Sequence, residues 1–288
     1  FKYLQKEQKR LFPNKIKKIT SAISLIGDDF FKILNAEKKL IGSKINFVQH
    51  GGSMHIDLPI THCWQVSDLV STWGKANWMM EYNKYKKKVK VIGYKKGKQT
   101  SKKIKDKDYF AFLSVNTISC SVVKIAKIMT TQEEYNLYLQ NIINFLNLVP
   151  KEIRKKIVIG VKEEPYGVNT AKKILKLKFP EMDSYINCGG QLAKISGLHI
   201  STYFGTMELE TLEKKIPTIF LEADPRCLHH GPTGKNIVSK LKTNGYYFTN
   251  PYKAAKSLLK IHENTKKFKL DFFKNASVKK LIKLYLNK

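Results

Sequence analysis

The stretch Leu198–Glu222 reads LHISTYFGTMELETLEKKIPTIFLE and changes twice between strand-like and helix-like patterns. Leu198–Thr202 has the length and apolar content of a short buried strand. Thr206–Lys215 is typical of a helix, and Pro217–Glu222 is a second compact apolar run. Two strands joined by a helix pair in parallel, so this stretch predicts one βαβ unit of a parallel sheet.

The same alternation extends along much of the chain on either side. Further strands are predicted at Tyr109–Val115 and Lys156–Val161. Apolar spacing and helix-ending residues predict helices at Thr131–Val149, Val168–Lys178, Gly234–Thr243 and Pro251–Lys266. Right-handed crossovers between such strands give a doubly wound, Rossmann-like domain of the α/β class. We expect this complete domain to span residues 108–266.

A basic segment interrupts this rhythm and divides the chain. Residues 86–107 hold eleven lysines and one aspartate around one short strand, Val89–Ile92, which indicates an exposed basic linker. Before this linker, strands are predicted at Lys44–Gln49 and Asp68–Thr72. We therefore expect residues 1–85 to be the remnant of a second Rossmann-like domain in an N-terminally truncated chain.

The charge of the chain is high and comes from lysine. The 288 residues carry a formal net charge of +30, and 50 of the 53 basic residues are lysines. Lysine codons are rich in A and T, so an AT-rich genome accounts for much of this excess. Recognition of nucleic acid favours arginine, whose planar guanidinium binds guanine and phosphate in a bidentate way. A basic nucleic-acid-binding protein is the alternative from another class, and it predicts a steep salt dependence of DNA binding.

Composition also bears on location. No run of 18 apolar residues predicts a transmembrane helix, and the first residues, FKYLQKEQKR, lack an apolar signal core. The cysteines lie far apart without a CxxC pair, which disfavours a zinc site or a disulfide framework. We expect a cytoplasmic protein without a metal. Its basic C-terminal helix or tail, residues 267–288, is compatible with peripheral attachment to the inner face of an anionic membrane.

The first candidate site is the strand end Gln49-His50-Gly51-Gly52. Ligands of open α/β sheets bind beyond the carboxyl ends of strands, and paired glycines let the backbone approach a ligand. A histidine at the position of His50 can act as a general base or a hydrogen-bond donor near neutral pH, and Asp57 is a second candidate for a base or an acceptor of hydrogen bonds from sugar hydroxyls. The alternative is a tight turn with a structurally hydrogen-bonded histidine.

The second candidate site is the turn that follows Leu198–Thr202. Ser201 and Thr202 end the strand, and Gly205 and Thr206 fall at the start of the next helix. The amides at a helix N-terminus attract phosphate, and Glu210, one turn into the helix, is placed to accept hydrogen bonds from ribose. The alternative is a plain helix cap. Neither a Walker A loop nor a GxGxxG motif is present.

Two further segments have weaker signals. Lys162 follows a predicted strand and is a candidate for pairing with phosphate, and Tyr166 is a candidate for lining a base or sugar. A proline- and glycine-containing turn with solvated charges is the alternative. The adjacent pair His229-His230 does not have metal-ligand spacing, because neighbouring side chains point in different directions.

Taken together, three segments resemble a known family. VQHGG (Val48–Gly52), SDLVSTWG (Ser67–Gly74) and STYFGTMELETLEKKIPTIF (Ser201–Phe220) are similar to a family of bacterial transferases of GT-B type, associated with surface-polysaccharide gene clusters. The resemblance extends from about residue 40 to residue 268. Where the family usually has an arginine, this chain has Lys162-Glu163-Glu164.

The resemblance implies a GT-B-like glycosyltransferase with two Rossmann-like domains. Its C-terminal domain would hold a nucleotide-sugar donor through Gly205, Thr206 and Glu210, and Gln49, His50, Gly51 and Gly52 would lie on the acceptor side. The acceptor would be a glycan or lipid-linked precursor of a surface polysaccharide or lipopolysaccharide, and no cofactor would be obligatory. A transferase of polyol phosphate from a CDP-activated donor on a similar fold is the alternative.

Overall fold

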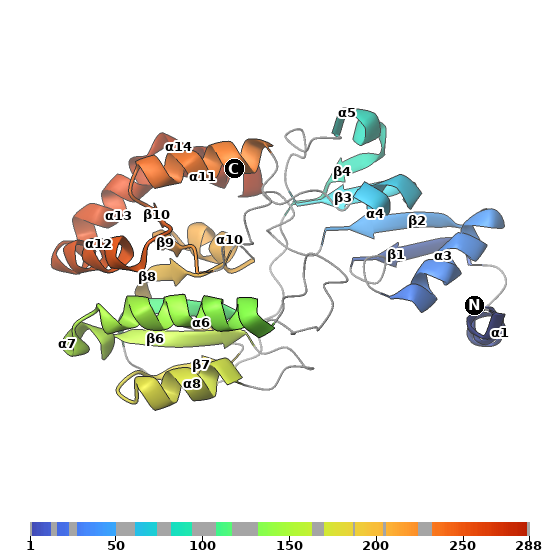
Figure 1. The fold of residues 1–288 in the computed structure, drawn as a ribbon. Helices are drawn as coiled ribbons and strands as arrows, with labels where there is room; N and C mark the ends of the chain where they lie inside the picture. The colour runs from blue at the N-terminus through green and yellow to red at the C-terminus, as the bar shows by residue number, and fades with distance from the viewer. Residues whose placement is uncertain are drawn as a thin grey trace. The chain divides into compact units, whose positions relative to one another are not determined.

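The computed structural model describes residues 2–12, 16–22, 28–49, 61–73, 82–93, 108–116, 132–162, 170–186, 188–203, 206–223 and 232–286. The chain divides into two compact units (Figure 1). The first comprises Phe1–Lys96, His230–Gly234 and Lys283–Lys288, and the second comprises Gly97–His229 and Lys235–Ile282.

The first unit is built on a parallel sheet with the strand order β1-β2-β3-β4. Its strands are β1 (Lys18–Ser21), β2 (Lys44–Val48), β3 (Leu69–Thr72) and β4 (Val89–Val91). Its helices are α1 (Lys2–Leu11), α3 (Asp29–Leu40), α4 (Thr61–Val66) and α5 (Tyr82–Tyr85), followed by the 3-10 turn η2 (Lys86–Lys88). Phe47 and Val70 of the sheet pack on Trp64 and Tyr85 to form the core of this unit.

The short strand expected inside the basic linker belongs to this first sheet. β4 pairs in parallel with β3, with Val70 opposite Val89 and Thr72 opposite Val91. The short strand expected at Val89–Ile92 is therefore present, as the edge strand of this sheet. An exposed lysine such as Lys90 fits an edge, where charge discourages pairing with another chain. Residues 94–107 lie outside the described part of the chain.

The second unit contains a larger parallel sheet with the strand order β10-β9-β8-β5-β6-β7 (Figure 1). The strands are β5 (Tyr109–Asn116), β6 (Ile157–Lys162), β7 (Ser184–Ile186), β8 (Ser196–Ser201), β9 (Thr218–Leu221) and β10 (Tyr247–Phe248). All described pairings are parallel. The α/β class and the parallel sheet predicted from the sequence are thus confirmed.

In the described residues, helices precede and follow these strands. They are α6 (Gln132–Asn147), α7 (Lys151–Arg154), α8 (Thr170–Lys178), α9 (Gly189–Leu192), α10 (Thr206–Glu213), α11 (Pro232–Thr243), α12 (Pro251–Glu263), α13 (Thr265–Lys274) and α14 (Ala276–Leu286). The single helix predicted at Pro251–Lys266 ends at Glu263, because Asn264 adopts a non-helical conformation there and caps α13 by accepting a hydrogen bond from the Lys267 amide.

The two faces of the larger sheet differ in chemistry. Alternate residues of a strand point to opposite faces. One face is aliphatic, with side chains such as Leu113, Ile159 and Ile200 buried under α6, α8 and α12. The other carries Phe112 and Val158, packed with residues of α9 and α10, and also the buried polar side chains Ser114, His199 and Thr218. The second face therefore combines packing with a polar network.

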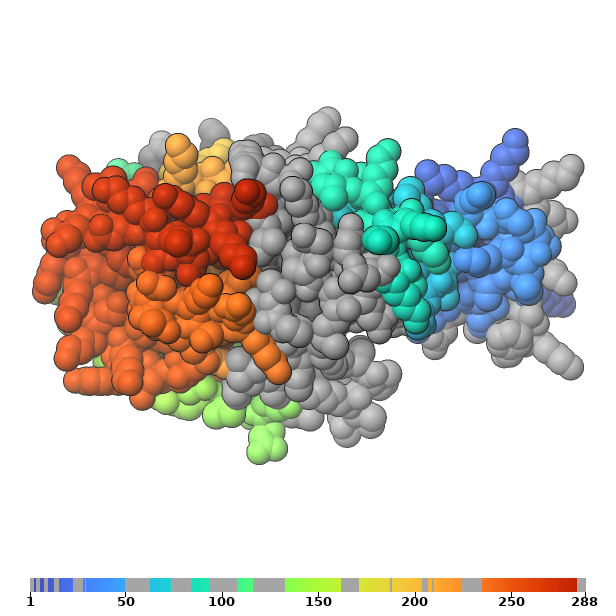
Figure 2. Space-filling view, turned by 90° about the horizontal axis from the view of Figure 1, so that it is seen from above, coloured from blue at the N-terminus to red at the C-terminus, as the bar shows by residue number. Residues whose placement is uncertain are grey.

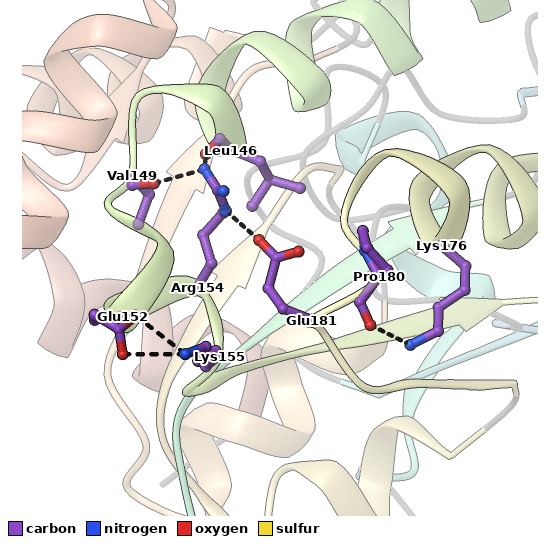
Figure 3. Close-up of polar contacts among 8 residues, drawn as sticks. All are labelled: Leu146, Val149, Glu152, Arg154, Lys155, Lys176, Pro180 and Glu181. Atoms are coloured by element: carbon purple, nitrogen blue, oxygen red, sulfur yellow. Dashed lines mark hydrogen bonds and ion pairs between the residues drawn. The ribbon is translucent and has the colours of Figure 1, made fainter.

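Arg154, one of only three arginines in the chain, ties together the turns at one end of this unit (Figure 3). Its Nε donates to Glu181 Oε1 at 2.7 Å, and its Nη1 donates to the carbonyl oxygens of Leu146 and Val149 at 3.1 and 2.9 Å. The guanidinium carbon lies 5.3 Å from the centroid of the Phe179 ring. Burial by itself would raise the pKa of Glu181, but a backbone hydrogen bond and the neighbouring Arg154 guanidinium outweigh it and lower this pKa.

We expect Arg154→Lys to lower the free energy of unfolding by about 2 kcal/mol, because an ammonium group cannot reach all three acceptors in the geometry of the guanidinium fork. Denaturation followed by far-UV circular dichroism measures the change. Lys155→Arg is the matched control, since the Lys155–Glu152 pair is exposed and should contribute less than about 0.5 kcal/mol. Equal stability of Arg154→Lys and the wild type would contradict the assignment.

Candidate functional site

The strand order places a topological switch point between β5 and β8. β5 comes first in sequence among the strands of this sheet; β6 and β7 extend the sheet on one side of β5, and β8, β9 and β10 extend it on the other. In open α/β sheets the ligand binds outside the carboxyl ends of the strands at such a point. Ser114 lies opposite Ser201, and Asn116 lies opposite Lys162, so the ends of β5, β6 and β8 share one edge. The predicted site residues Lys162, Ser201 and Thr202 are therefore brought to this edge.

Thr202 bridges the switch point. Its Oγ1 donates to the carbonyl oxygen of Ser114 at 2.7 Å and lies 2.6 Å from Tyr138 Oη of α6. Because the single threonine proton points to Ser114, the tyrosine hydroxyl is the donor in the second contact. Thr202 is buried, and it joins the ends of β5 and β8 to α6.

Ser201 and Glu208 fix the turn into α10. Ser201 Oγ lies 2.5 Å from the carbonyl oxygen of Tyr203 and contacts Glu208 Oε1, and both side chains are buried. The predicted contacts of Ser201 and Thr202 with a donor phosphate therefore compete with partners inside the protein. Glu210 lies two residues beyond Glu208 on the same helix and is only partly buried.

A buried histidine connects α10 to the sheet. The His199 ring stacks on Phe112, with centroids 4.3 Å apart and an interplanar angle of 7°. Its Nε2 lies 2.9 Å from Ser114 Oγ, and its Nδ1 lies 3.3 Å from Thr211 Oγ1 of α10. Thr211 Oγ1 is also 3.2 Å from Thr218 Oγ1 of β9. This network, which was not predicted from the sequence, holds the helix that carries Glu210 against three strands.

α9 holds α10 from another side. Gly189 allows Met207 to approach closely, since a Cβ at this glycine would lie 2.1 Å from Met207 Cε. Lys214 Nζ donates to the carbonyl oxygen of Gly190 at 2.7 Å. The described contacts of α10 therefore fix its orientation near both ends, as a preorganised binding element requires.

Burial lowers the pKa of His199 from its ordinary value of 6.5 to about 3. Between these values the unfolded chain binds a proton that the folded protein does not, so this residue reduces stability as the pH falls below 6.5. We expect a contribution of about 1.4 kcal/mol per pH unit to the slope of the unfolding free energy. His199→Gln should have a correspondingly smaller slope below pH 6.5 in denaturation experiments, although its stability at pH 8 is lower. Parallel slopes across the acidic range would contradict a neutral buried imidazole.

In the first unit, Gln49 anchors the end of β2. Its backbone amide nitrogen donates to the Ser71 carbonyl oxygen at 2.8 Å. Its side-chain Oε1 accepts a hydrogen bond from the Trp73 backbone amide at 2.8 Å. Gln49 is buried, so it bridges the ends of β2 and β3 immediately before His50. These two contacts fix the position of Gln49 in the unit that is predicted to bind the acceptor.

Several predicted residues lie outside the described part of the chain. These are His50, Gly51, Gly52, Asp57, Tyr166 and Gly205, together with the pair His229-His230. The backbones of Lys162 and Thr206 are described, at the end of β6 and the start of α10, but not their side chains. Among the described residues, His, Cys, Asp and Glu form no group of three or more suited to a metal ion. In the same residues no helix has the length and apolar character needed to span a bilayer.

The similarity of the chain to one solved structure, that of MnaA, supports the fold. A Staphylococcus aureus MnaA structure with UDP superimposes with a TM-score of 0.58 at 12% sequence identity, covering 99% of this chain and 75% of MnaA. Os79 from O. sativa in complex with UDP gives a TM-score of 0.49 at 10% identity, covering 98% of this chain and 75% of that one. No curated protein matches the chain. The fold is GT-B-like, as the sequence predicted.

A family model covers nearly the whole chain and gives the class of enzyme. The model is described as LIC12162 family transferase, and it matches residues 1–267. This span includes both sheets, the Gln49 strand end and the turn from Ser201 to Glu210. The chain therefore belongs to the LIC12162 family of transferases, and the predicted transferase activity is confirmed at this level.

Proposed function

We propose that this transferase is a glycosyltransferase whose second unit binds a nucleotide-sugar donor at the carboxyl edge of β5 and β8. The observation that supports this proposal best is the switch point itself, where Thr202, Tyr138 and Ser114 join the strand ends and α10 begins. The amides at the start of an eight-residue helix supply donors suited to a diphosphate. The similar MnaA structure contains UDP, which makes UDP the first nucleotide to test.

The proposed roles follow from this placement. Glu210 accepts hydrogen bonds from the ribose hydroxyls, the amides near Gly205 and Thr206 bind the phosphates, and Lys162 and Tyr166 contribute to the same donor site. Ser201 and Thr202 shape the turn through their protein contacts. No metal is needed in this scheme, because helix amides and lysine meet the charge of the leaving group.

On the acceptor side, His50 acts as the general base, and Asp57 is the second candidate for a base or an acceptor of hydrogen bonds from sugar hydroxyls. His50 takes the proton of an acceptor hydroxyl, whose oxygen forms a bond to the anomeric carbon of the sugar. The bond from that carbon to the diphosphate breaks, and the nucleoside diphosphate leaves with the bonding electrons. Gly51 and Gly52 allow the backbone to approach the acceptor closely. The acceptor we propose is a glycan or lipid-linked precursor of a cell-surface polysaccharide, used at the inner face of the membrane.

A thermal-shift screen with UMP, UDP, GDP, CMP and CDP tests the donor site. A nucleotide at about 100 times its dissociation constant adds about 2.7 kcal/mol to the unfolding free energy, which corresponds to a rise in Tm of about 5–10 °C. We expect UDP to give this rise. Stabilisation by CDP and CMP instead would favour transfer of a polyol phosphate from a CDP-activated donor. A chain that responds to none of the five would refute the proposed donor site.

A further inference from the structure

The C-terminal helices carry a concentration of exposed lysines that the donor site does not use. α12, α13 and α14 contain ten lysines and two acidic residues, and all ten lysines are exposed. The fraction of residues that are lysine is higher in these three helices than in the whole chain, in which 50 of 288 residues are lysine. Codon composition alone would spread lysines more evenly, so this local excess requires its own explanation.

α13 combines this charge with an exposed apolar side chain. Phe272 is buried and fixes the inward face of the helix, so Leu270 lies on the outward face with 59% of its surface exposed. Lys266, Lys267 and Lys274 stand four and three residues before it and four residues after it, which places them around it on the same face. Within the described residues none of these lysines forms an ion pair.

The surface around α13 faces outward and is extensive. Figure 2 shows the orange and red atoms of α11 to α14 as one broad surface. On α14, Lys279 and Lys280 are exposed, and the buried Val278 and Leu281 turn the other side of the helix to the protein. The lysine stems and Leu270 thus present apolar groups beneath a layer of charge, as interfacial helices do.

We propose that the outward face of α13, with Leu270 inside the ring formed by Lys266, Lys267 and Lys274, docks on a bilayer that contains anionic lipid. Positive charge draws these residues to the headgroups, and Leu270 enters the boundary with the acyl chains. A nucleic acid would use the lysines but gain nothing from an exposed leucine, and phosphate recognition of that kind favours arginine. This inference rests on the membrane location proposed above, and it does not depend on which nucleotide sugar is the donor.

Sedimentation with vesicles tests the surface. At about 0.1 M salt, we expect the chain to bind phosphatidylcholine vesicles that contain about 30% phosphatidylglycerol and not vesicles of phosphatidylcholine alone. Replacing Lys266, Lys267 and Lys274 by glutamine should weaken binding about 100-fold, since each basic residue contributes about a fivefold gain near an anionic surface. Leu270→Ser should weaken it about fivefold, because one partly inserted apolar side chain is lost.

Leu137→Ser on α6 is the matched control. Leu137 is also exposed, at 48%, but Glu133 and Glu134 stand four and three residues before it, so its replacement should leave vesicle binding unchanged. Equal effects of Leu270→Ser and Leu137→Ser, or equal binding to both kinds of vesicle, would overturn the proposal. Binding to random duplex DNA that the lysine variant loses and Leu270→Ser retains, without vesicle binding, would instead identify a nucleic-acid surface. None of these outcomes changes the result of the nucleotide screen.

Discussion

Glu210→Ala is expected to weaken the binding of the nucleotide identified by the screen by about 100-fold. A carboxylate that accepts two hydrogen bonds from ribose contributes about 2.7 kcal/mol when its loss leaves the hydroxyls without a partner in the complex. Glu210 is a half-buried residue one turn into α10, the helix whose first amides are proposed to bind the phosphates. Isothermal titration calorimetry with UDP measures the change directly.

The neighbouring glutamates of α10 separate this role from a general effect of charge. Glu208 is 3% exposed and held by Ser201, so it supports the turn and does not face a ligand. Glu213 lies one turn beyond Glu210, and its replacement by alanine removes the same charge as the replacement of Glu210. Glu213→Ala should therefore change UDP affinity by less than about twofold. If Glu213→Ala and Glu210→Ala weakened UDP equally, the ribose contact assigned to Glu210 would be wrong.

Predictions from the sequence succeeded where apolar runs are long. β5, β6, β8 and β9 are compact apolar segments between turn residues, and α6 shows a helical spacing across 16 residues. β7, α9 and β10 contain three, four and two residues, which is too short for either period to show, and they were missed. β4 was expected as a short strand within a basic segment, and its place at the edge of the first sheet is a tertiary property that the sequence does not show.

The arrangement of the candidate site was less accessible from the sequence. The end of β5 was not singled out, because the order of strands, and hence the switch point, is a tertiary property. The sequence also does not show that Tyr203, Glu208 and Ser114 contact the hydroxyls of Ser201 and Thr202, which are predicted to contact the donor. For the buried network, the available signal in the sequence was His199, a polar residue within an apolar strand. Its partner Thr211 lies on the following helix, and the sequence does not show that the two side chains meet.

His50→Ala is expected to lower the turnover of sugar transfer by about 10²–10⁴-fold, the usual contribution of a general base, while the affinity for UDP stays unchanged. Gln49, directly before it, is anchored to Trp73, so His50 follows a fixed strand end. Release of nucleoside diphosphate from the nucleotide sugar, with a surface-polysaccharide precursor as acceptor, measures turnover.

Two further measurements distinguish a base from a binding residue at this position. Added imidazole should restore part of the lost turnover of His50→Ala, because the small base can take the acceptor proton in place of the missing side chain. His50→Gln retains a hydrogen-bonding side chain but cannot take the acceptor proton, so it should be as slow as His50→Ala. A histidine that only binds the donor would give the reverse pattern, with weakened UDP binding, near-normal turnover at saturation and no rescue by imidazole. That pattern would transfer His50 to the donor site and leave Asp57 as the remaining candidate base.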